Sequence, residues 1–329
     1  MHADGLEQRS RTADLRKHVL DAIALNRVSD FHFPACYLGV TAERVDADGS
    51  LMVIPYGPHV TDSKGAIDVA AIAILADMSL SSAMRPHVDP TSRMATVTLH
   101  LHFTGVAARE RLFASGHLEG LLQGPTGIPG TPRAGQGRCS AELRAGVDLI
   151  CLASATFANP PLPPGVTLAP FPWQCRSGSP TPLAMRGLTA DERRIMRRAE
   201  HALRSDASAE AQASKGFIER FWGLAVDAAT EGKAAATLVP GPHIANRVGH
   251  VQGGVLFGIA TATAQAALPA PALLTGASAW YISPGDGVRL RFRSTLLQLG
   301  KTVAVVRTEV FAAGRRRVLE MVSGYAPLV

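Results

Sequence analysis

An internal repeat constrains the fold of this 329-residue chain more than any other feature of its sequence. The motif Gly-Pro-His at Gly57–His59 returns 184 residues later at Gly241–His243. The same shift, carried forward without gaps, pairs residues of matching character: Asp62 with Asn246, Gly65 with Gly249, Ile67 with Val251, Ile72 with Leu256, Leu75 with Ile259 and Ala76 with Ala260. Few of these pairs are identical, so the repeat indicates an old duplication. A chain of this length has room for two domains of about 150 residues each.

Each half predicts the same order of structural elements. A long apolar stretch follows each copy of the motif, Val69–Met84 in the first half and Val255–Leu268 in the second. Both stretches are apolar nearly all round, which predicts helices near 68–84 and 252–268 that are wrapped by a sheet. Alternating or β-rich runs then predict antiparallel strands at 95–103, 288–293, 302–311 and 317–325. We therefore expect an α+β fold with one buried helix in each half.

The boundary between the halves is marked by composition. Residues 159–187 contain eight prolines and little periodicity, which is typical of a surface linker. We expect an N-terminal domain at 1–159, a proline-rich linker at 160–187 and a C-terminal domain at 188–329. A second Gly- and Pro-rich stretch, 123–137, predicts a long loop between two strands. Thr189 and Glu192 form a capping-box pattern that predicts the start of a helix.

The charge and the cysteines of the chain limit the kinds of partner and the cellular compartment that we expect. The formal net charge of +6 suits an anionic ligand, but the Lys and Arg residues are scattered and aromatics make up only 5%, which argues against nucleic acid. The apolar stretch Val251–Pro271 contains two glutamines and three glycines and is broken by Pro269, so a buried helix explains it better than a membrane span. Four cysteines without metal-type or CxxC spacing, and an N-terminus without an apolar segment, predict reduced thiols and a cytoplasmic protein. These cysteines are Cys36, Cys139, Cys151 and Cys175.

The segment Asn246–Gly254 resembles a known motif. It reads Asn, two residues, Gly249, two residues, then Gln252-Gly253-Gly254 at the start of the apolar helix. This pattern is similar to that of the hotdog superfamily, and the closest branch is the PaaI-like thioesterases of the 4HBT type. Their motif has His before the two glycines and an Asp or Glu inside the helix. The resemblance covers 217–328 and, more faintly, 33–159. It implies two hotdog domains in tandem about a pseudo-twofold axis.

The two halves depart from the family motif in complementary ways. The second half keeps the glycines but has Thr261 where the family has its helix acid. The first half keeps an acid, Asp77, but has Asp68 and Val69 in place of Gln252 and the first glycine. Family sites combine the acid of one subunit with the glycine helix start of the other. The resemblance therefore implies one composite site, with an inactive counterpart at Thr261. The predicted catalytic residues are Asp77, Asn246, Gln252, Gly253 and Gly254.

This set of residues suits the hydrolysis of an acyl-CoA thioester. The Gly253 N–H at the helix start, with the Asn246 or Gln252 amide, would stabilise the oxyanion that develops on the carbonyl oxygen. Asp77 would act as nucleophile or as general base for water. In the structural alternative the glycines allow a close helix contact, and Asp77 caps a loop or faces a solvent groove. Four hydroxyl side chains are candidates for holding the water: Ser81, Ser82, Ser92 and Thr96.

The remaining polar residues are assigned by position. His250 is expected to line the site or to lie on the surface, whereas His59 and His243 occupy equivalent turns, which predicts a structural role for both. His100 and His102 have a spacing that metal ligands use, but no third ligand is apparent, so no metal is predicted. The arginines of the 288–293 strand could meet CoA phosphates or form a solvated face; they are Arg289, Arg291 and Arg293.

We expect an acyl-CoA thioesterase that needs neither a metal nor a redox cofactor, with acyl-CoA as its small-molecule partner. Neither nucleic acid nor a membrane is expected, and the double-hotdog chains are expected to form homo-oligomers. One alternative is a hotdog hydratase or dehydratase, which would require a catalytic His where Gln252 stands. The other is a non-catalytic double hotdog that binds acyl-CoA or another ligand.

Overall fold

A computed structural model describes residues 2–29, 31–89, 92–122, 135–160, 171, 180–204, 216–223 and 226–327. The first half contains the helices α1 (His2–Ser29), α2 (Phe33–Leu38) and α3 (Val69–Met84), and the strands β1 (Thr41–Asp46), β2 (Gly49–Ile54), β3 (Ala95–Phe103), β4 (Leu112–Leu122), β5 (Gln136–Ala145) and β6 (Asp148–Ala158). The second half contains the helices α4 (Ala190–Arg204), α6 (Phe217–Trp222) and α7 (Gly253–Ala266), and the strands β7 (Val226–Thr230), β8 (Lys233–Leu238), β9 (Ala272–Tyr281), β10 (Leu290–Leu299), β11 (Ala304–Phe311) and β12 (Arg317–Pro327).

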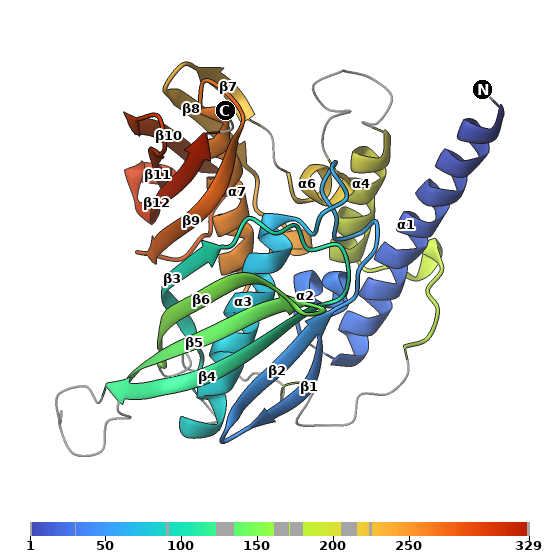
Figure 1. Cartoon of the computed structure of the whole chain (residues 1–329). Helices are drawn as coiled ribbons and strands as arrows, with labels where there is room; N and C mark the ends of the chain where they lie inside the picture. Colours follow the sequence, from blue (N-terminus) through green and yellow to red (C-terminus); the bar gives the residue numbers. More distant parts are fainter. Residues whose placement is uncertain are drawn as a thin grey trace.

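Twelve strands within the described residues form one antiparallel sheet (Figure 1). Their order is β1-β2-β4-β5-β6-β3 in the first half and, read from its own edge, β7-β8-β10-β11-β12-β9 in the second. The two orders are the same, and the halves join where β3 pairs with β9, with Thr98 opposite Trp280 and His102 opposite Gly276. Each half-sheet curls round one helix, α3 or α7 (Figure 1). The predicted tandem hotdog architecture is confirmed.

The turn before each central helix repeats at the level of single hydrogen bonds. Asp62 Oδ1 accepts from the backbone N–H groups two and four residues further on, at 2.8 and 2.9 Å. Asn246 Oδ1 does the same at 3.1 and 3.0 Å. Gly65 and Gly249 occupy the same place in the two turns with φ of 74° and 81°, a conformation that favours glycine. The structure therefore supports the duplication that the sequence shift indicates.

The two central helices are buried as their sequences predict, and in the structure a side chain caps the start of each. Asp68 accepts from the Ala70 N–H at the start of α3, and Gln252 accepts from the Val255 N–H at the start of α7. The stretch Val69–His87 is long and apolar enough to cross a membrane, but 83% of it is buried inside the protein. It is the core helix of a folded domain.

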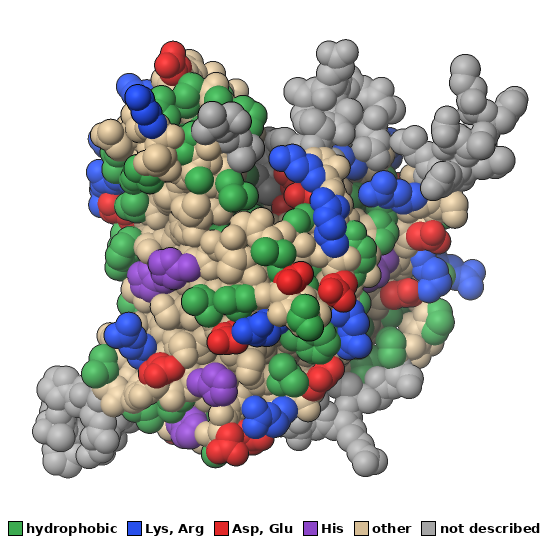
Figure 2. Space-filling model, viewed as in Figure 1, with side chains coloured by type: hydrophobic (Ala, Val, Ile, Leu, Met, Phe, Trp, Pro, Cys, Tyr) green, Lys and Arg blue, Asp and Glu red, His purple; other side chains and the backbone are tan. Residues whose placement is uncertain are grey.

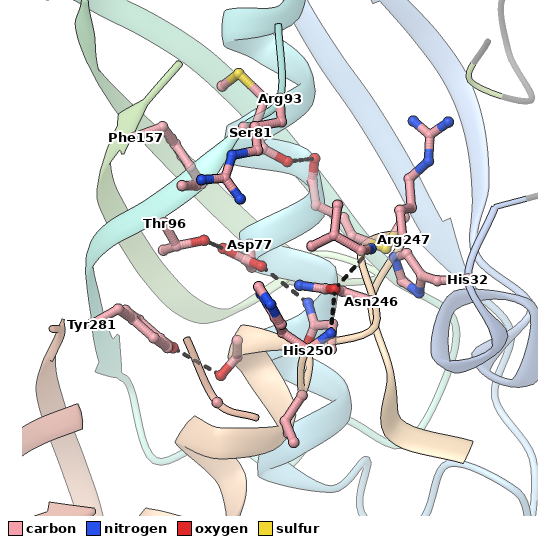
Figure 3. A pocket seen from close by; sticks show the side chains of 18 of the residues that line it. His32, Asp77, Ser81, Arg93, Thr96, Phe157, Asn246, Arg247, His250 and Tyr281 are labelled. Carbon is pink, nitrogen blue, oxygen red and sulfur yellow. Dashed lines mark hydrogen bonds between the residues drawn. The ribbon is translucent and has the colours of Figure 1, made fainter. Parts of the chain in front are cut away.

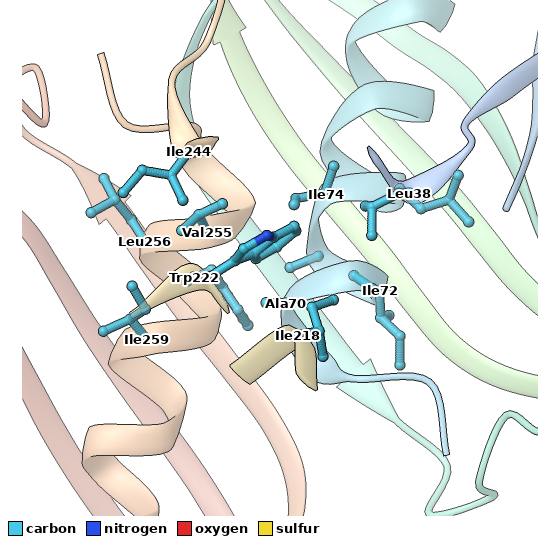
Figure 4. Packing of buried hydrophobic residues seen from close by; sticks show 14 of the residues in the cluster. Leu38, Ala70, Ile72, Ile74, Ile218, Trp222, Ile244, Val255, Leu256 and Ile259 are labelled. Carbon is cyan, nitrogen blue, oxygen red and sulfur yellow. The ribbon is translucent and has the colours of Figure 1, made fainter. Parts of the chain in front are cut away.

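An antiparallel contact joins α3 to α7. A Cβ on Gly254 would lie 2.5 Å from the Ile74 backbone nitrogen, and one on Gly258 would lie 2.2 Å from the Ala70 Cβ. The helices can therefore approach this closely only because both positions are glycine. Figure 4 shows the buried residues around this contact, which include Trp222 of α6. Trp222 is 1% exposed and adds to the shared core.

An aromatic cluster from α2 and α6 closes one side of the core; its members are Phe33, Tyr37, Phe217, Phe221 and Trp222. The two repeated histidines contact it, His59 beside Tyr37 and His243 beside Phe221. Burial lowers the pKa of both imidazoles to about 3. Both histidines are thus neutral core residues in this structure.

The remaining elements refine the expectations from sequence. The capping box at Thr189 and Glu192 is present, with the Thr189 N–H donating to Glu192 at 2.6 Å and the Glu192 N–H donating back at 3.3 Å. Arg27 of α1 donates to the same carboxylate, so α1 packs beside α4 across the two halves (Figure 1). Residues 123–134 of the expected loop and most of the expected linker lie outside the described residues, and 136–137 belong to β5.

Three cysteines are buried as free thiols, namely Cys36, Cys139 and Cys151, and burial raises the pKa of each. Cys175 lies outside the described residues. On the face seen in Figure 2, acidic and basic side chains are interspersed with apolar ones.

The close helix contact yields a stability prediction. Gly258→Ala should lower the free energy of unfolding by about 1–3 kcal/mol, because the added Cβ forces α3 and α7 apart. Gly120→Ala is the control, since Gly120 is exposed on β4 and a Cβ there has no atom within 4 Å. Chemical denaturation measures both variants. Equal stability of the two variants would show that the helix contact is not tight.

Candidate active site

A pocket of about 380 Å³ lies where the two halves meet. From the first half it is lined by the part of α3 from Asp77 to Ser82 and by the start of β3. From the second half it is lined by the turn before α7, by the first turn of α7 and by the end of β9. The pocket therefore includes one side of the α3–α7 contact, and neither half forms it alone.

Asp77 is bonded on both carboxylate oxygens within this pocket (Figure 3). The Thr96 hydroxyl donates to Oδ1 at 2.8 Å, and the Gln252 side-chain amide donates to Oδ2 at 3.0 Å. Asp77 and Gln252 come from opposite halves and are 175 residues apart in sequence. The structure thus brings together the acid and the helix start that the sequence places in one composite site.

The position of Asp77 sets its acidity. The side chain is 8% exposed, and burial raises its pKa from 3.8 to about 6, although the bonds from Thr96 and Gln252 lower it. Asp77 is therefore mostly ionised at neutral pH and remains a stronger base than an exposed aspartate. A pKa near the working pH is what general base catalysis requires.

The hydroxyl that completes the site is Thr96, which the sequence did not distinguish from three others. Ser81 donates to the Met78 carbonyl at 3.1 Å and Ser92 donates to the Asp89 carbonyl at 2.7 Å. Ser82 is buried and lines the pocket. Thr96 alone among the four donates to Asp77 in the described structure.

Gln252 connects the acid to the helix. Its Oε1 accepts from the Val255 N–H at 3.1 Å while its Nε2 donates to Asp77, so the amide is fixed from both ends. Gly253 and Gly254 occupy the first turn of α7, where backbone N–H groups have no partner within the helix. The positive end of the helix dipole is at the same place. This arrangement favours a negatively charged or polarised oxygen beside Asp77.

The two glycines have different roles. A Cβ on Gly253 would lie 3.5 Å from Asp77 Oδ2, so glycine keeps the space beside the carboxylate open. Gly254 is not among the pocket-lining residues, and its missing side chain makes room for Ile74. Tyr281, which the sequence did not single out, donates to the Gly253 carbonyl at 2.8 Å and holds the start of the helix.

The other predicted residues are placed as follows. Asn246 lines the pocket, but its Oδ1 is used by its own turn. His250 lines the pocket, and burial lowers its pKa. The strand arginines, Arg289, Arg291 and Arg293, are exposed beside or on β10 and do not belong to the pocket lining. Three other arginines line it instead: Arg85, Arg93 and Arg247. Their clustering depends on tertiary structure and left no signal in the sequence.

At the pseudo-symmetric position a threonine stands in place of the acid. Thr261, which replaces the acid on α7, is 5% exposed and donates to the Phe257 carbonyl of its own helix at 2.8 Å. Asp68 caps α3 through the Ala70 N–H, and burial raises its pKa to about 7. Glu219 of α6 is near enough to raise that pKa further. This position therefore has no acid on α7 and a like-charged neighbour at the α3 start.

Comparisons with known proteins identify the fold. No protein-family model and no curated protein matches the chain. A protein of unknown function with a hot dog fold from Alicyclobacillus acidocaldarius is similar in structure at 10% identity and a TM-score of 0.50, covering 87% of this chain and 96% of its own. A Lactobacillus plantarum protein provisionally named an oleoyl thioesterase is similar at 11% identity and the same TM-score, covering 87% and 100%. The tesB protein of Mycobacterium avium subs paratuberculosis gives 13% identity and a TM-score of 0.49, covering 87% and 96%.

The chain has a tandem hotdog fold. At these identities the likeness defines the fold and leaves the activity to be argued from the pocket.

Burial of Asp77 yields a second prediction. Between pH 3.8 and about 6 the folded protein binds more protons at Asp77 than the unfolded chain, so this residue reduces stability as the pH rises. The loss is complete above about pH 6 and absent below about pH 4. Asp77→Asn should therefore raise the melting temperature at neutral pH by on the order of a few degrees, and the gain should vanish in acid.

An asparagine at position 77 can keep both hydrogen bonds. Its side-chain oxygen can accept from the Gln252 amide, and its own NH₂ group can donate to the Thr96 hydroxyl oxygen. Asp148→Asn, at an exposed position on β6, is the control. Calorimetry across this pH range is the measurement. A destabilised Asp77→Asn variant at neutral pH would contradict the effect ascribed to burial.

Proposed function

We propose that the protein hydrolyses an acyl-CoA thioester to the free acid and CoA in this composite pocket. The observation that carries the proposal is the chain Thr96–Asp77–Gln252 at the open first turn of α7. It combines a base with a raised pKa, two groups that orient it, and N–H donors beside it. Acyl transfer to water needs these parts and no metal.

The geometry suits a water-mediated reaction. Each Asp77 oxygen accepts one hydrogen bond, and a carboxylate has about four lone-pair sites, so sites are left to bind a water. Asp77 takes a proton from this water while the water oxygen forms a bond to the acyl carbon. The carbonyl oxygen, now negative, is stabilised by the first N–H groups of α7. The C–S bond then breaks, CoA leaves as a thiolate, and the proton passes to the thiolate.

Direct attack by Asp77 on the acyl carbon is the alternative, with an anhydride formed and then hydrolysed. We take the base role for Asp77, because burial raises its pKa to about 6, close to the pH at which a general base works.

The rival hotdog reactions fit less well. A hydratase or dehydratase of the expected kind needs an imidazole at the helix start, where this chain has Gln252. The nearest imidazole along the turn, His250, lies 3.9 Å from the Asp286 carboxylate. A purely binding role would not require a buried carboxylate, whose desolvation costs stability.

Activity should depend on the ionisation of Asp77. Asp77→Asn should lower kcat by about two to four orders of magnitude, the usual loss for a positioned base. In the wild type, kcat/KM should fall about tenfold per pH unit below about pH 6. Thr96→Val removes a bond that lowers the pKa of Asp77, so the inflection should move to higher pH.

Ser81→Ala is the matched control, because Ser81 lines the same pocket and donates to a backbone carbonyl instead. Release of thiol from a panel of acyl-CoAs, followed with a thiol reagent, provides all of these rates. Near-wild-type turnover in Asp77→Asn, or an equal shift of the inflection in Thr96→Val and Ser81→Ala, would exclude Asp77 as the base.

A further inference from the structure

Three arginines converge on the candidate active site from separate elements. Arg85 lies eight residues beyond Asp77, at the end of α3, which corresponds to about 12 Å along a helix axis. Arg93 lies just before β3, and Arg247 lies in the turn that precedes α7. All three line the pocket that contains Asp77. We refer to Arg85, Arg93 and Arg247 as the arginine cluster.

The pocket has an excess of positive charge. Asp77 is the only carboxylate among the described lining residues, against three guanidinium groups. Two imidazoles also line the pocket, and burial lowers the pKa of each, to about 3 for His32 and below its usual value for His250. They therefore leave the excess unchanged at neutral pH. Asp89, outside the lining, acts on Arg85 more weakly than Arg247 does.

Arg85 is held in the pocket wall at a cost in free energy. The residue is 5% exposed, and its Nη1 donates to the Ser92 carbonyl at 2.8 Å. Its guanidinium carbon lies 5.0 Å from the centre of the Phe171 ring, and that of Arg247 lies 4.4 Å from the same ring. Burial, and then the charge of Arg247, lowers the pKa of Arg85 to about 10. Two like charges beside one ring are stabilised when an anion joins them.

Two guanidinium donors in the cluster have no partner. The Nε atoms of Arg85 and Arg93 are buried and have no hydrogen-bond partner among the described residues. A guanidinium binds a carboxylate or a phosphate through two parallel N–H groups, and the Nε edge supplies such a pair. Figure 3 shows the Arg93 side chain on the same side of the pocket as Ser81 and Thr96. The free edges, the burial and the excess charge together indicate an oxyanion ligand.

We propose that the arginine cluster binds an oxyanion group of the thioester substrate, and this rests on the proposed function. Two parts of a CoA thioester carry that chemistry: the phosphates of CoA, and a free carboxylate at the far end of a dicarboxylic acyl group. A nucleotide phosphate would bring its bulky adenosine with it. The burial of Arg85 and the pocket volume of about 380 Å³ favour the acyl carboxylate.

Binding of non-hydrolysable thioethers tests the proposal independently of turnover. Four compounds separate the two sources: carboxypentyl and hexyl thioethers of CoA, and the same two thioethers of phosphate-free pantetheine. In titration calorimetry the wild type should bind each carboxypentyl compound at least about tenfold more tightly than its hexyl partner, the usual effect of a charge-assisted hydrogen bond. Arg93→Gln should abolish that difference and leave hexyl binding unchanged.

Arg85→Gln is the companion variant, since Gln can still donate to the Ser92 carbonyl. Arg144→Gln, an exposed change on β5, is the control and should leave all four affinities unchanged. If the CoA thioethers instead bind more tightly than the pantetheine thioethers, and Arg93→Gln removes that preference, the cluster binds an oxyanion and its source is phosphate. If neither preference exists, or Arg93→Gln changes neither, the proposal is overturned. Specific binding without hydrolysis of the matching thioesters would leave this inference standing and would overturn only the proposed function.

Discussion

The close antiparallel contact between α3 and α7 is the constraint on which the rest of the structure depends. Gly254 and Gly258 allow the helices to approach until the α7 backbone meets Ile74 and Ala70. At that separation the Gln252 side chain at the start of α7 reaches Asp77, one turn along α3 from Ile74. A larger residue at either glycine would move the acid away from the helix start. The packing of the core and the geometry of the site therefore follow from the same contact.

The site also concentrates unfavourable electrostatics in one pocket. Asp77 is buried with a raised pKa, and Arg85 is buried with a lowered one. These groups are not paired with each other: Asp77 is held by Thr96 and Gln252, and Arg85 by a backbone carbonyl. Such an arrangement reduces stability, and the surrounding apolar core compensates for it. A charged group retained at this cost is typical of a ligand-binding or catalytic pocket.

The sequence predicted the elements whose signal is local or repeated. The apolar runs predicted α3 and α7, and the 184-residue shift related their start positions. The losses of the glycine at Val69 and of the acid at Thr261 are complementary, and together they predicted a composite pocket that contains Asp77. The sequence could not select Thr96 among four hydroxyls, because that choice depends on how β3, which carries Thr96, packs against α3, which carries Asp77. It also offered the arginines of 288–293 as candidates for contact with CoA, and the alternation with Leu290 and Phe292 directs those side chains to solvent.

The central claim is that each chain has one working site, made from the acid of one half and the helix start of the other. The most direct test is calorimetric titration of the purified chain with a non-hydrolysable acyl-CoA thioether, with hydrolysis measured for the double variant Asp68→Asn/Thr261→Ala. The account predicts saturation at one equivalent per chain and a hydrolysis rate within a few fold of the wild type, because neither substituted residue contacts the pocket. Two equivalents of similar affinity, or a loss of rate as large as that expected for Asp77→Asn, would contradict it.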